Sequence, residues 1–156
     1  MNELLPDIRN AVRAVILRDE AILMQKKWSE TRGHWYTLPG GGQDVHETLI
    51  EALQRECEEE IGTLVQVEGL LHVADFYKQR ETDFPSTRHL VEFLFACSVP
   101  GDYQPRGGSH PDKHQIDVVW LPVGKLTEYR LFPSSMAAYL PGGQDGKNAS
   151  YLGVID

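Results

Sequence analysis

The stretch that decides the fold is LPGGGQDVHETLIEALQRECEEEIG, residues 38–62. Three consecutive glycines, Gly40 to Gly42, precede a segment with helical periodicity over residues 45–61. This segment stops at Gly62, and glycine readily adopts the left-handed conformation that follows the last turn of a helix. The sequence therefore predicts a glycine-rich loop that leads directly into a helix.

The predicted helix carries acidic residues on the side that should face the core. At about 100° per residue, one apolar arc holds Leu49, Ile50, Leu53, Cys57 and Ile61. Glu60 falls inside this arc, Glu56 lies at its edge and Glu59 a little beyond, whereas Glu51 and Glu58 point toward solvent. Carboxylates on an apolar side must lose water, which is costly unless they are paired or bound to a cation. A single guanidinium, that of Arg55, cannot neutralise them all, so the pattern indicates Mg²⁺ or Mn²⁺ held by oxygen ligands.

The glycines fit such a site. They let the backbone bend tightly and approach a ligand closely, so that their carbonyls add metal ligands and nearby amides meet phosphate oxygens. A simple turn would explain one or two glycines but not the loop and the acidic face together. The loop is not a P-loop, because no Gly-Lys-Ser/Thr follows it.

From Gly41 to Gly62 the chain resembles the Nudix box at every fixed position. The matching residues, in order, are Gly41, Glu47, Arg55, Glu56, Glu59, Glu60 and Gly62. Thr63 and Cys57 depart from the usual aliphatic residues, and both are small enough to pack. The flanking segments YTLPGG and VVWLP also resemble the family.

The resemblance implies a fold, a reaction and roles for the residues of the box. The implied fold is α/β, an α/β/α sandwich with a mixed β-sheet and a loop–helix metal site. The implied reaction is hydrolysis of a nucleoside diphosphate linked to another group, X. Glu56, Glu59 and Glu60 would bind the metal with the Gly41 carbonyl, Arg55 would orient the glutamates, and Glu47 would hold the loop–helix junction.

The general base has several candidates. A glutamate at the metal site can take a proton from water, so Glu59 and Glu56 are the first choices. The family often places its base on a loop instead, and here the loop candidate is Asp112 in SHPDKHQ, with Glu81 and Asp83 behind it.

Other residues are candidates for binding the substrate. Gly40 and Gly42 would contact phosphates through the backbone, and Tyr36, one of the aromatic residues before the box, would stack on a base or pack under the loop. Arg80, Arg88 and Arg106 are candidates for an outer phosphate, and Arg88 is the one we select. His110 and His114 flank Asp112, but imidazoles in a polar loop are usually solvated, and Trp120 fits a core strand.

Composition limits the class of protein. The chain of 156 residues has the size of one domain, so we expect a single domain over residues 1–156. A net charge of −8 argues against a nucleic acid partner and makes a metal more plausible for a polyphosphate substrate. No apolar run approaches a membrane span, no secretory signal is visible, and Cys57 and Cys97 form no disulfide framework. We therefore expect a cytoplasmic protein with a small-molecule nucleotide substrate, and the resemblance allows a homodimer.

The remaining segments complete the predicted fold. Strands are expected at 10–19 and 20–28, joined at Asp19-Glu20, and then, after a polar loop over 28–35, at 36–39, 63–78, 88–99 and 116–122. Residues 100–115 form a loop, 123–126 begin a helical turn, and 132–140 form a short helix capped by Ser134 or Ser135. Residues 141–150 are expected to form a flexible turn before a last short segment.

The substrate that we favour is ADP-ribose or another nucleotide sugar. Nucleoside triphosphates, including oxidised ones, and dinucleoside polyphosphates are alternatives, whereas coenzyme A is disfavoured because no second motif precedes the box. A non-catalytic, nucleotide-sensing Nudix module is the rival from another class, but it would be expected to lose glutamates of the box. A diphosphate isomerase would need a paired cysteine and glutamate that we cannot place.

Overall fold

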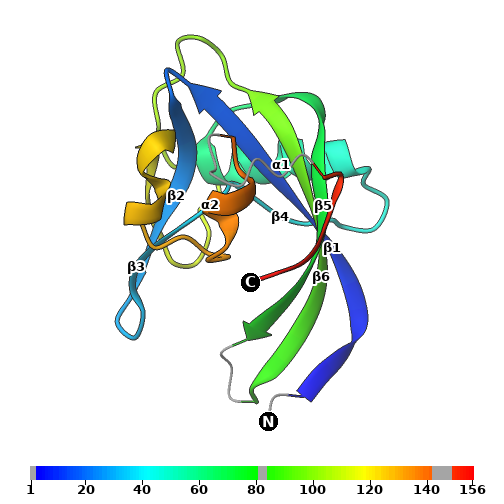
Figure 1. Cartoon of the computed structure of the whole chain (residues 1–156). Helices are drawn as coiled ribbons and strands as arrows, with labels where there is room; N and C mark the ends of the chain where they lie inside the picture. Colours follow the sequence, from blue (N-terminus) through cyan, green and yellow to red (C-terminus); the bar gives the residue numbers. More distant parts are fainter. Residues whose placement is uncertain (1–2, 81–83, 142–148) are drawn as a thin grey trace.

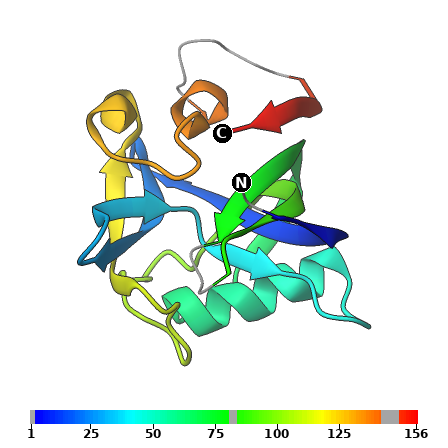
Figure 2. The same cartoon turned by 90° about the horizontal axis from the view of Figure 1, so that it is seen from below.

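The computed structural model describes residues 3–80, 84–141 and 149–156, and it shows a mixed sheet with helices on both faces (Figures 1 and 2). The strands are β1 (Glu3–Arg18), β2 (Ala21–Ser29), β3 (Gly33–Thr37), β4 (Gly40–Gly42), β5 (Gln66–Arg80), β6 (Ser86–Ser98), β7 (Gln115–Pro122) and β8 (Tyr151–Ile155). The helices are α1 (Leu49–Ile61), the 3₁₀ helix η1 (Val123–Glu128) and α2 (Met136–Tyr139). No helix in the described ranges is long and apolar enough to cross a membrane.

The strand order is β3-β2-β1-β6-β5-β8, with β4 paired to β1 and β7 paired to β2. β1 runs parallel to β6 along most of its length, but it pairs with β2 only next to their connecting turn, at Leu17↔Ile22 and Arg18↔Ala21. Beyond that turn the two strands separate, as Figure 1 shows. The sheet therefore opens into two halves, and β4 lies along the edge of β1 that β2 leaves free.

Each face of β1 contributes to its own hydrophobic core because side chains alternate along a strand. Val12, Ala14 and Ile16 pack in the cluster that α1 covers, together with Leu53, Cys57 and Ile61 of the helix. Ala11 and Val15 pack in the other cluster, with η1, α2 and β8. Figure 2 shows α1 on one side of the strands and α2 on the other, which confirms the predicted α/β class with helices on both faces of a mixed sheet.

The helix α1 begins at Leu49 rather than at residue 45. Thr48 is the N-cap: its side chain accepts a hydrogen bond from the Glu51 amide, and the Glu51 side chain accepts one from the Thr48 amide. This capping box stops the helix from extending backward. The end was predicted correctly, since Gly62 has a left-handed φ of 73°.

Several element boundaries differ from those predicted. β1 starts at Glu3, and its Pro6 falls within a register shift between Leu4 and Ile8, where a strand tolerates proline. β3 starts at Gly33 inside the predicted polar loop, because β2 and β3 pair down to Ser29↔Gly33. The glycines predicted as a loop form β4.

The C-terminal region also differs from the prediction. The α2 helix is shorter than the predicted 132–140, and no serine side chain caps it. Ser134 Oγ instead donates to the Asp156 carbonyl, and Ser135 Oγ accepts from the Asp156 amide. Most of the predicted 141–150 turn lies outside the described residues, and the last segment is β8, parallel to β5.

Candidate active site

The side chain of Glu60 is buried although it is a carboxylate. It is 3% exposed, and its Oε2 accepts hydrogen bonds from Gln25 Nε2 and from the Gly40 amide, the latter at 3.5 Å. Burial, and then the hydrogen bond and charge of Glu56, raise the pKa of Glu60 well above its usual value. The helical wheel predicted this core-facing position for Glu60, but Ile50, assigned to the same arc, is 47% exposed.

Glu56 lies against the glycine strand β4. A Cβ on Gly41 would stand 2.6 Å from the Glu56 carboxyl carbon, closer than real contacts allow. A Cβ on Gly40, which has a φ of 141°, would stand 1.9 Å from the Val12 carbonyl oxygen. Both positions therefore need glycine, Gly40 for the fit of β4 against β1 and Gly41 for the fit of Glu56 against β4.

Arg55 connects the box residues to each other. Its Nε donates to Glu47 Oε2 at 2.6 Å, and its Nη1 donates to Glu56 Oε1 at 3.0 Å and to Glu59 Oε2 at 3.3 Å. Its Nη2 donates to the Gly42 carbonyl at 3.0 Å. One guanidinium therefore ties the loop–helix junction to two of the three central glutamates. The hydrogen bond and charge of Arg55 also lower the pKa of Glu47.

The donor set fits a hard cation, although it is not prearranged around one. Within the described ranges, no three His, Cys, Asp or Glu side chains are already grouped as metal ligands, and Arg55 binds oxygens of Glu56 and Glu59. However, the Oε1 atom of Gln25 is buried without a hydrogen-bond partner beside Glu60. Carboxylates, an amide oxygen and glycine carbonyls are the ligands that Mg²⁺ and Mn²⁺ prefer.

The loop between β6 and β7 packs on the last turn of α1. The amides of His110 and Gly108 donate to the carbonyls of Glu59 and Glu60 at 2.8 and 3.2 Å, and the Tyr103 hydroxyl donates to the Ile61 carbonyl at 2.7 Å. These carbonyls have no partner within the helix. The loop therefore completes the hydrogen bonding of the helix end.

This loop places Asp112 at the cleft. Asp112 Oδ2 accepts a hydrogen bond from Lys27 Nζ, and Oδ1 accepts one from the Lys113 amide at 2.7 Å. Partial burial opposes its charge, but the charge and hydrogen bond of Lys27 lower the pKa of Asp112 overall. Asp112 is therefore ionised at neutral pH, as a general base must be.

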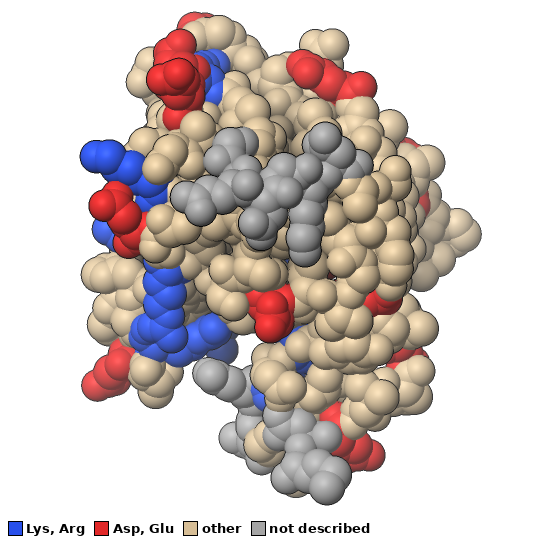
Figure 3. Space-filling model, viewed as in Figure 1, with Lys and Arg blue, Asp and Glu red and all other residues tan. Residues whose placement is uncertain are grey.

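The glutamates, the glycines and Asp112 all line one cleft of about 820 Å³ between the two halves of the sheet. The cations that line it are Arg9, Arg13, Lys27, Arg32, Lys78, Arg80, Arg88 and Lys113. In Figure 3, Lys and Arg side chains gather around a hollow between the body of the molecule and its lower extension. A chain with a net charge of −8 therefore presents many of its cations at this one cleft.

Arg13 and Glu92 are cleft residues that the sequence analysis missed. Arg13 Nε and Nη2 donate to the Glu92 carboxylate at 3.0 and 3.4 Å, and Arg13 Nη1 donates to the Gly40 carbonyl at 3.0 Å. Burial opposes the charge of Arg13, but Glu92 more than offsets it and raises the pKa of Arg13. One sequence signal could have revealed this pair: each of two apolar runs contains a charged residue, Arg13 in NAVRAVIL and Glu92 in LVEFLF.

Trp35 replaces Tyr36 as the aromatic residue of the cleft. Trp35 and Thr37 line the cleft and Tyr36 does not, since neighbouring side chains in a strand point to opposite faces. The Tyr36 ring packs edge-on against Tyr129 at 5.4 Å. Tyr36, which we selected as a substrate-binding residue, therefore lies on the other face of β3 from this cleft, and its role stays a prediction.

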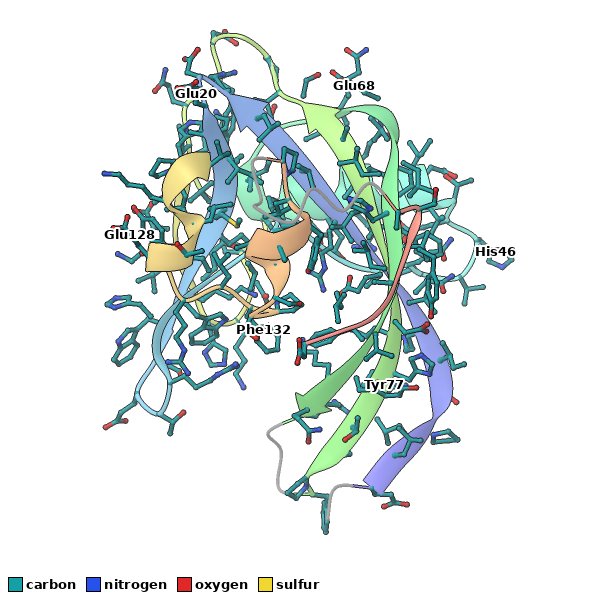
Figure 4. All side chains as sticks on the ribbon, viewed as in Figure 1. Glu20, His46, Glu68, Tyr77, Glu128 and Phe132 are labelled. Atoms are coloured by element: carbon teal, nitrogen blue, oxygen red, sulfur yellow. The ribbon has the colours of Figure 1, made fainter. Side chains whose placement is uncertain are left out.

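Arg32 covers the Trp35 ring at 4.5 Å and the Phe132 ring at 5.0 Å. Figure 4 places Phe132 at the inner side of the segment that leads to α2. The ring of Trp35 also lies 5.5 Å from the ring of His114. Trp35 is 4% exposed, so the partly exposed side chains of Arg32 and Phe132 offer the stacking surface for a nucleobase.

The remaining predicted site residues differ in whether they line the cleft. Arg80 and Arg88 line the cleft, as do Gly40 and Gly42, whereas Arg106 does not; its Nη2 donates to the Gly62 carbonyl. His110 and His114 line the cleft but belong to no metal-ligating group among the described residues. Glu81 and Asp83, the further base candidates, lie outside the described residues.

Comparison with known proteins shows which family the chain resembles. A family model described as NUDIX domain matches residues 7–141. Human 8-oxo-dGDP phosphatase NUDT18 is 47% identical over 113 residues, which cover 71% of this chain and 31% of the human protein. The ADP-ribose pyrophosphatase of Methanocaldococcus jannaschii is 30% identical over 112 residues, covering 72% of this chain and 63% of that protein. The chain thus spans less than a third of the human relative.

Solved structures agree with the fold. A MutT NUDIX hydrolase from Burkholderia pseudomallei is 27% identical, with a TM-score of 0.65 over 86% of this chain and 98% of that one. A NUDIX hydrolase from Nitrosomonas europaea, at 18% identity, has a TM-score of 0.66 over 92% of this chain and 93% of that one. At 18% identity, the similarity to the second structure shows only that the fold is shared.

Proposed function

Because the chain belongs to the NUDIX domain family, we propose that it hydrolyses the phosphoanhydride bond of a nucleoside diphosphate derivative with Mg²⁺ or Mn²⁺. Nudix homologues are pyrophosphohydrolases that act on small-molecule nucleotides, and they generally use divalent metals. The observation that carries the proposal is the position of Glu60. In this proposal a bound cation keeps the carboxyl group of Glu60, which is 3% exposed beside Glu56 at the edge of a cationic cleft, in its ionised form.

Each residue of the box has a part in this proposal. Glu56, Glu59, Glu60 and the Gly41 carbonyl would hold the metal, with Gln25 Oε1 as a further donor. Glu47 would hold the Arg55 side chain in place. Arg55 would in turn keep the glutamates directed toward the cleft. The metal, when bound, neutralises phosphate charge and lowers the pKa of water. The chain's own task is then to accept the proton of the attacking water.

The proton acceptor is Glu59, Glu56 or Asp112. Arg55 donates to both Glu56 and Glu59, whereas Lys27 donates to Asp112. Replacement of each by its amide separates the roles. Loss of the base lowers kcat and removes the acidic limb of the pH–rate profile, whereas loss of a ligand raises the metal concentration needed for half-maximal rate.

Two substrates are favoured. An oxidised guanine nucleoside diphosphate comes first, because the 47% identical human relative is named as an 8-oxo-dGDP phosphatase. ADP-ribose, which the sequence analysis favoured, comes second, because the archaeal relative is named as an ADP-ribose pyrophosphatase. The stacking surface formed by Arg32 and Phe132 would hold the purine in either case.

The test is hydrolysis of a nucleotide panel with Mg²⁺ or Mn²⁺. The panel holds 8-oxo-dGDP, dGDP, ADP-ribose, other nucleotide sugars, triphosphates and dinucleoside polyphosphates, with products resolved by ion exchange. We expect metal-dependent turnover that Glu59→Gln and Glu60→Gln abolish, and that Lys125→Gln, a change on the exposed side of η1, leaves intact. Tight nucleotide binding without turnover of any compound would overturn the hydrolase proposal in favour of a sensing module. Analytical ultracentrifugation of the same sample tests whether the chain forms the homodimer that the resemblance allows.

A further inference from the structure

A strip of basic residues lies on the cleft side of the strands that extend beyond the two cores. In Figure 1, the start of β1, the end of β5 and the start of β6 form an extension below the body of the molecule. Lys78 and Arg80 of β5 and Arg88 of β6 all line the cleft. In the register of these strands, Lys78 pairs with Arg88 and Arg80 pairs with Ser86.

This arrangement is unfavourable unless an anion is bound. Lys78 and Arg88 stand directly opposite each other in an antiparallel pair, where like charges destabilise a sheet. Arg88 Nη1 is buried without a hydrogen-bond acceptor in the described part of the chain, and Asp7 Oδ2, its ion-pair partner, stays 3.6 Å away. The extension therefore holds an unmet donor and two directly opposed like charges at the wall of the cleft.

Other cations increase the repulsion on Lys78. Enclosure in the cleft, and then the charges of Arg13 and Lys27, lower the pKa of Lys78, while Asp112 and Glu92 act in the opposite sense. Lys78 therefore lies within electrostatic reach of both walls. An anion placed between these side chains would relieve their mutual repulsion.

The Arg88 end of the basic strip is separate from the glutamates. Arg88 precedes Glu92 by four residues on β6, which corresponds to about 14 Å along an extended strand. Glu92 contacts Arg13, and Arg13 contacts Gly40 beside Glu60. The diphosphate held at the glutamates therefore does not reach Arg88, and a second anionic group of the substrate is needed to contact it.

We propose that Lys78, Arg80 and Arg88 form a phosphate subsite, which takes a phosphate group that the substrate carries in addition to its scissile diphosphate. Arginine binds phosphate through paired, charge-assisted hydrogen bonds. The enclosed position in the cleft selects a small molecule. This subsite rests on the proposed function for the identity of the scissile bond, but its affinity for phosphate can be measured without turnover.

Two matched nucleotide pairs test the proposal and locate the extra phosphate. One pair is ADP-ribose and ADP-ribose 2′-phosphate, and the other is GDP and GTP. Dissociation constants are measured by titration calorimetry with Mg²⁺ on the Glu59→Gln chain, so that no hydrolysis is needed. We expect the member with the additional phosphate to bind about tenfold more tightly in one pair, a difference of about 1.4 kcal/mol. The pair that shows the effect identifies which end of the substrate carries the phosphate.

Variants then assign the preference to the basic strip. Lys78→Gln and Arg88→Gln, each combined with Glu59→Gln, should reduce the ratio of dissociation constants to about one without weakening binding of the smaller nucleotide. Lys125→Gln, which removes a cation outside the cleft, should keep the full ratio. The midpoint of thermal unfolding should stay constant or rise in Arg88→Gln, because a like-charge pair is lost.

Two results would overturn the subsite. One is equal binding within both nucleotide pairs, and the other is a preference that survives in Lys78→Gln and Arg88→Gln. Absence of hydrolysis by the unmodified chain, with the phosphate preference intact, would refute the proposed function and leave the subsite standing.

Discussion

The Glu56 carboxylate packs directly on the backbone of Gly41, where a Cβ would stand 2.6 Å from its carboxyl carbon. The glycine of the box is therefore required by the position of Glu56, fifteen residues further along the chain, and not by the bend of the chain alone. An added Cβ on Gly41 would meet the end of the flexible Glu56 side chain, which can move aside. The fold therefore tolerates the substitution, but Glu56 would lose its position in the site.

Gly41→Ala should therefore reduce activity without unfolding the protein. We expect kcat to fall by about ten- to a hundredfold, the usual cost of disturbing the surroundings of a metal ligand, together with weaker Mn²⁺ binding. Electron paramagnetic resonance of added Mn²⁺ measures the binding. Gly124→Ala, at a position where an added Cβ meets nothing within 4 Å, is the control and should match the unmodified chain in both measurements.

Arg55 and Glu47 should be energetically coupled. The guanidinium makes its 2.6 Å hydrogen bond to Glu47 while also holding Glu56 and Glu59, and an ammonium cannot span these acceptors. In a double-mutant cycle of Arg55→Lys and Glu47→Gln, we expect a coupling free energy of unfolding of about 1–2 kcal/mol, measured by urea denaturation. Strict additivity of the two changes would show that the contact contributes nothing to stability.

Gly108→Ala should destabilise the fold itself. A Cβ there would stand 2.1 Å from the Glu58 carbonyl oxygen, and that neighbour is backbone. The loop would have to move off the end of α1, at a cost of about 1–3 kcal/mol, visible as a lower midpoint in thermal unfolding. Gly101→Ala in the same loop, with nothing within 4 Å of the added Cβ, should leave the midpoint unchanged.

Asp75 provides a test of charge on the outer face of the sheet. Hydrogen bonds from Tyr151 and then His89 lower the pKa of Asp75, and His89 Nε2 lies 2.7 Å from Asp75 Oδ1. A lowered pKa in the folded state means that ionised Asp75 favours folding above its unfolded pKa, and that this contribution is lost as the pH falls through the folded pKa. Tyr151→Phe should therefore move the pKa of Asp75 upward in a carboxyl carbon NMR titration. An unchanged value would exclude Tyr151 as the main cause.

The ends of α1 show what local sequence can determine. Gly62 marked the end because its left-handed conformation follows from the residue type. The start at Leu49 was missed because the capping box of Thr48 and Glu51 was not recognised, although both residues are visible in the sequence. Ile50 was placed in the core by periodicity, but the sheet covers a narrower stripe of the helix than its apolar residues suggest.

The cleft shows what local sequence cannot determine. The side of β3 that faces the cleft depends on its register with β2, so Tyr36 and Trp35 could not be distinguished in advance. The Arg13–Glu92 pair joins residues 79 positions apart, and only the parallel pairing of β1 with β6 brings them together. Contacts of this kind depend on the whole topology, whereas the glutamates of the box share one helix.

The hydrogen bonds between the loop of residues 100–114 and the last turn of α1 have a mechanical consequence. These hydrogen bonds tie the loop that carries Asp112 to the helix end that carries Glu59 and Glu60. A displacement of α1 would therefore carry the loop with it and preserve the spacing between Asp112 and the glutamates. In hydrogen exchange, the amides of Gly108 and His110 should then open together with the end of α1, as one cooperative unit.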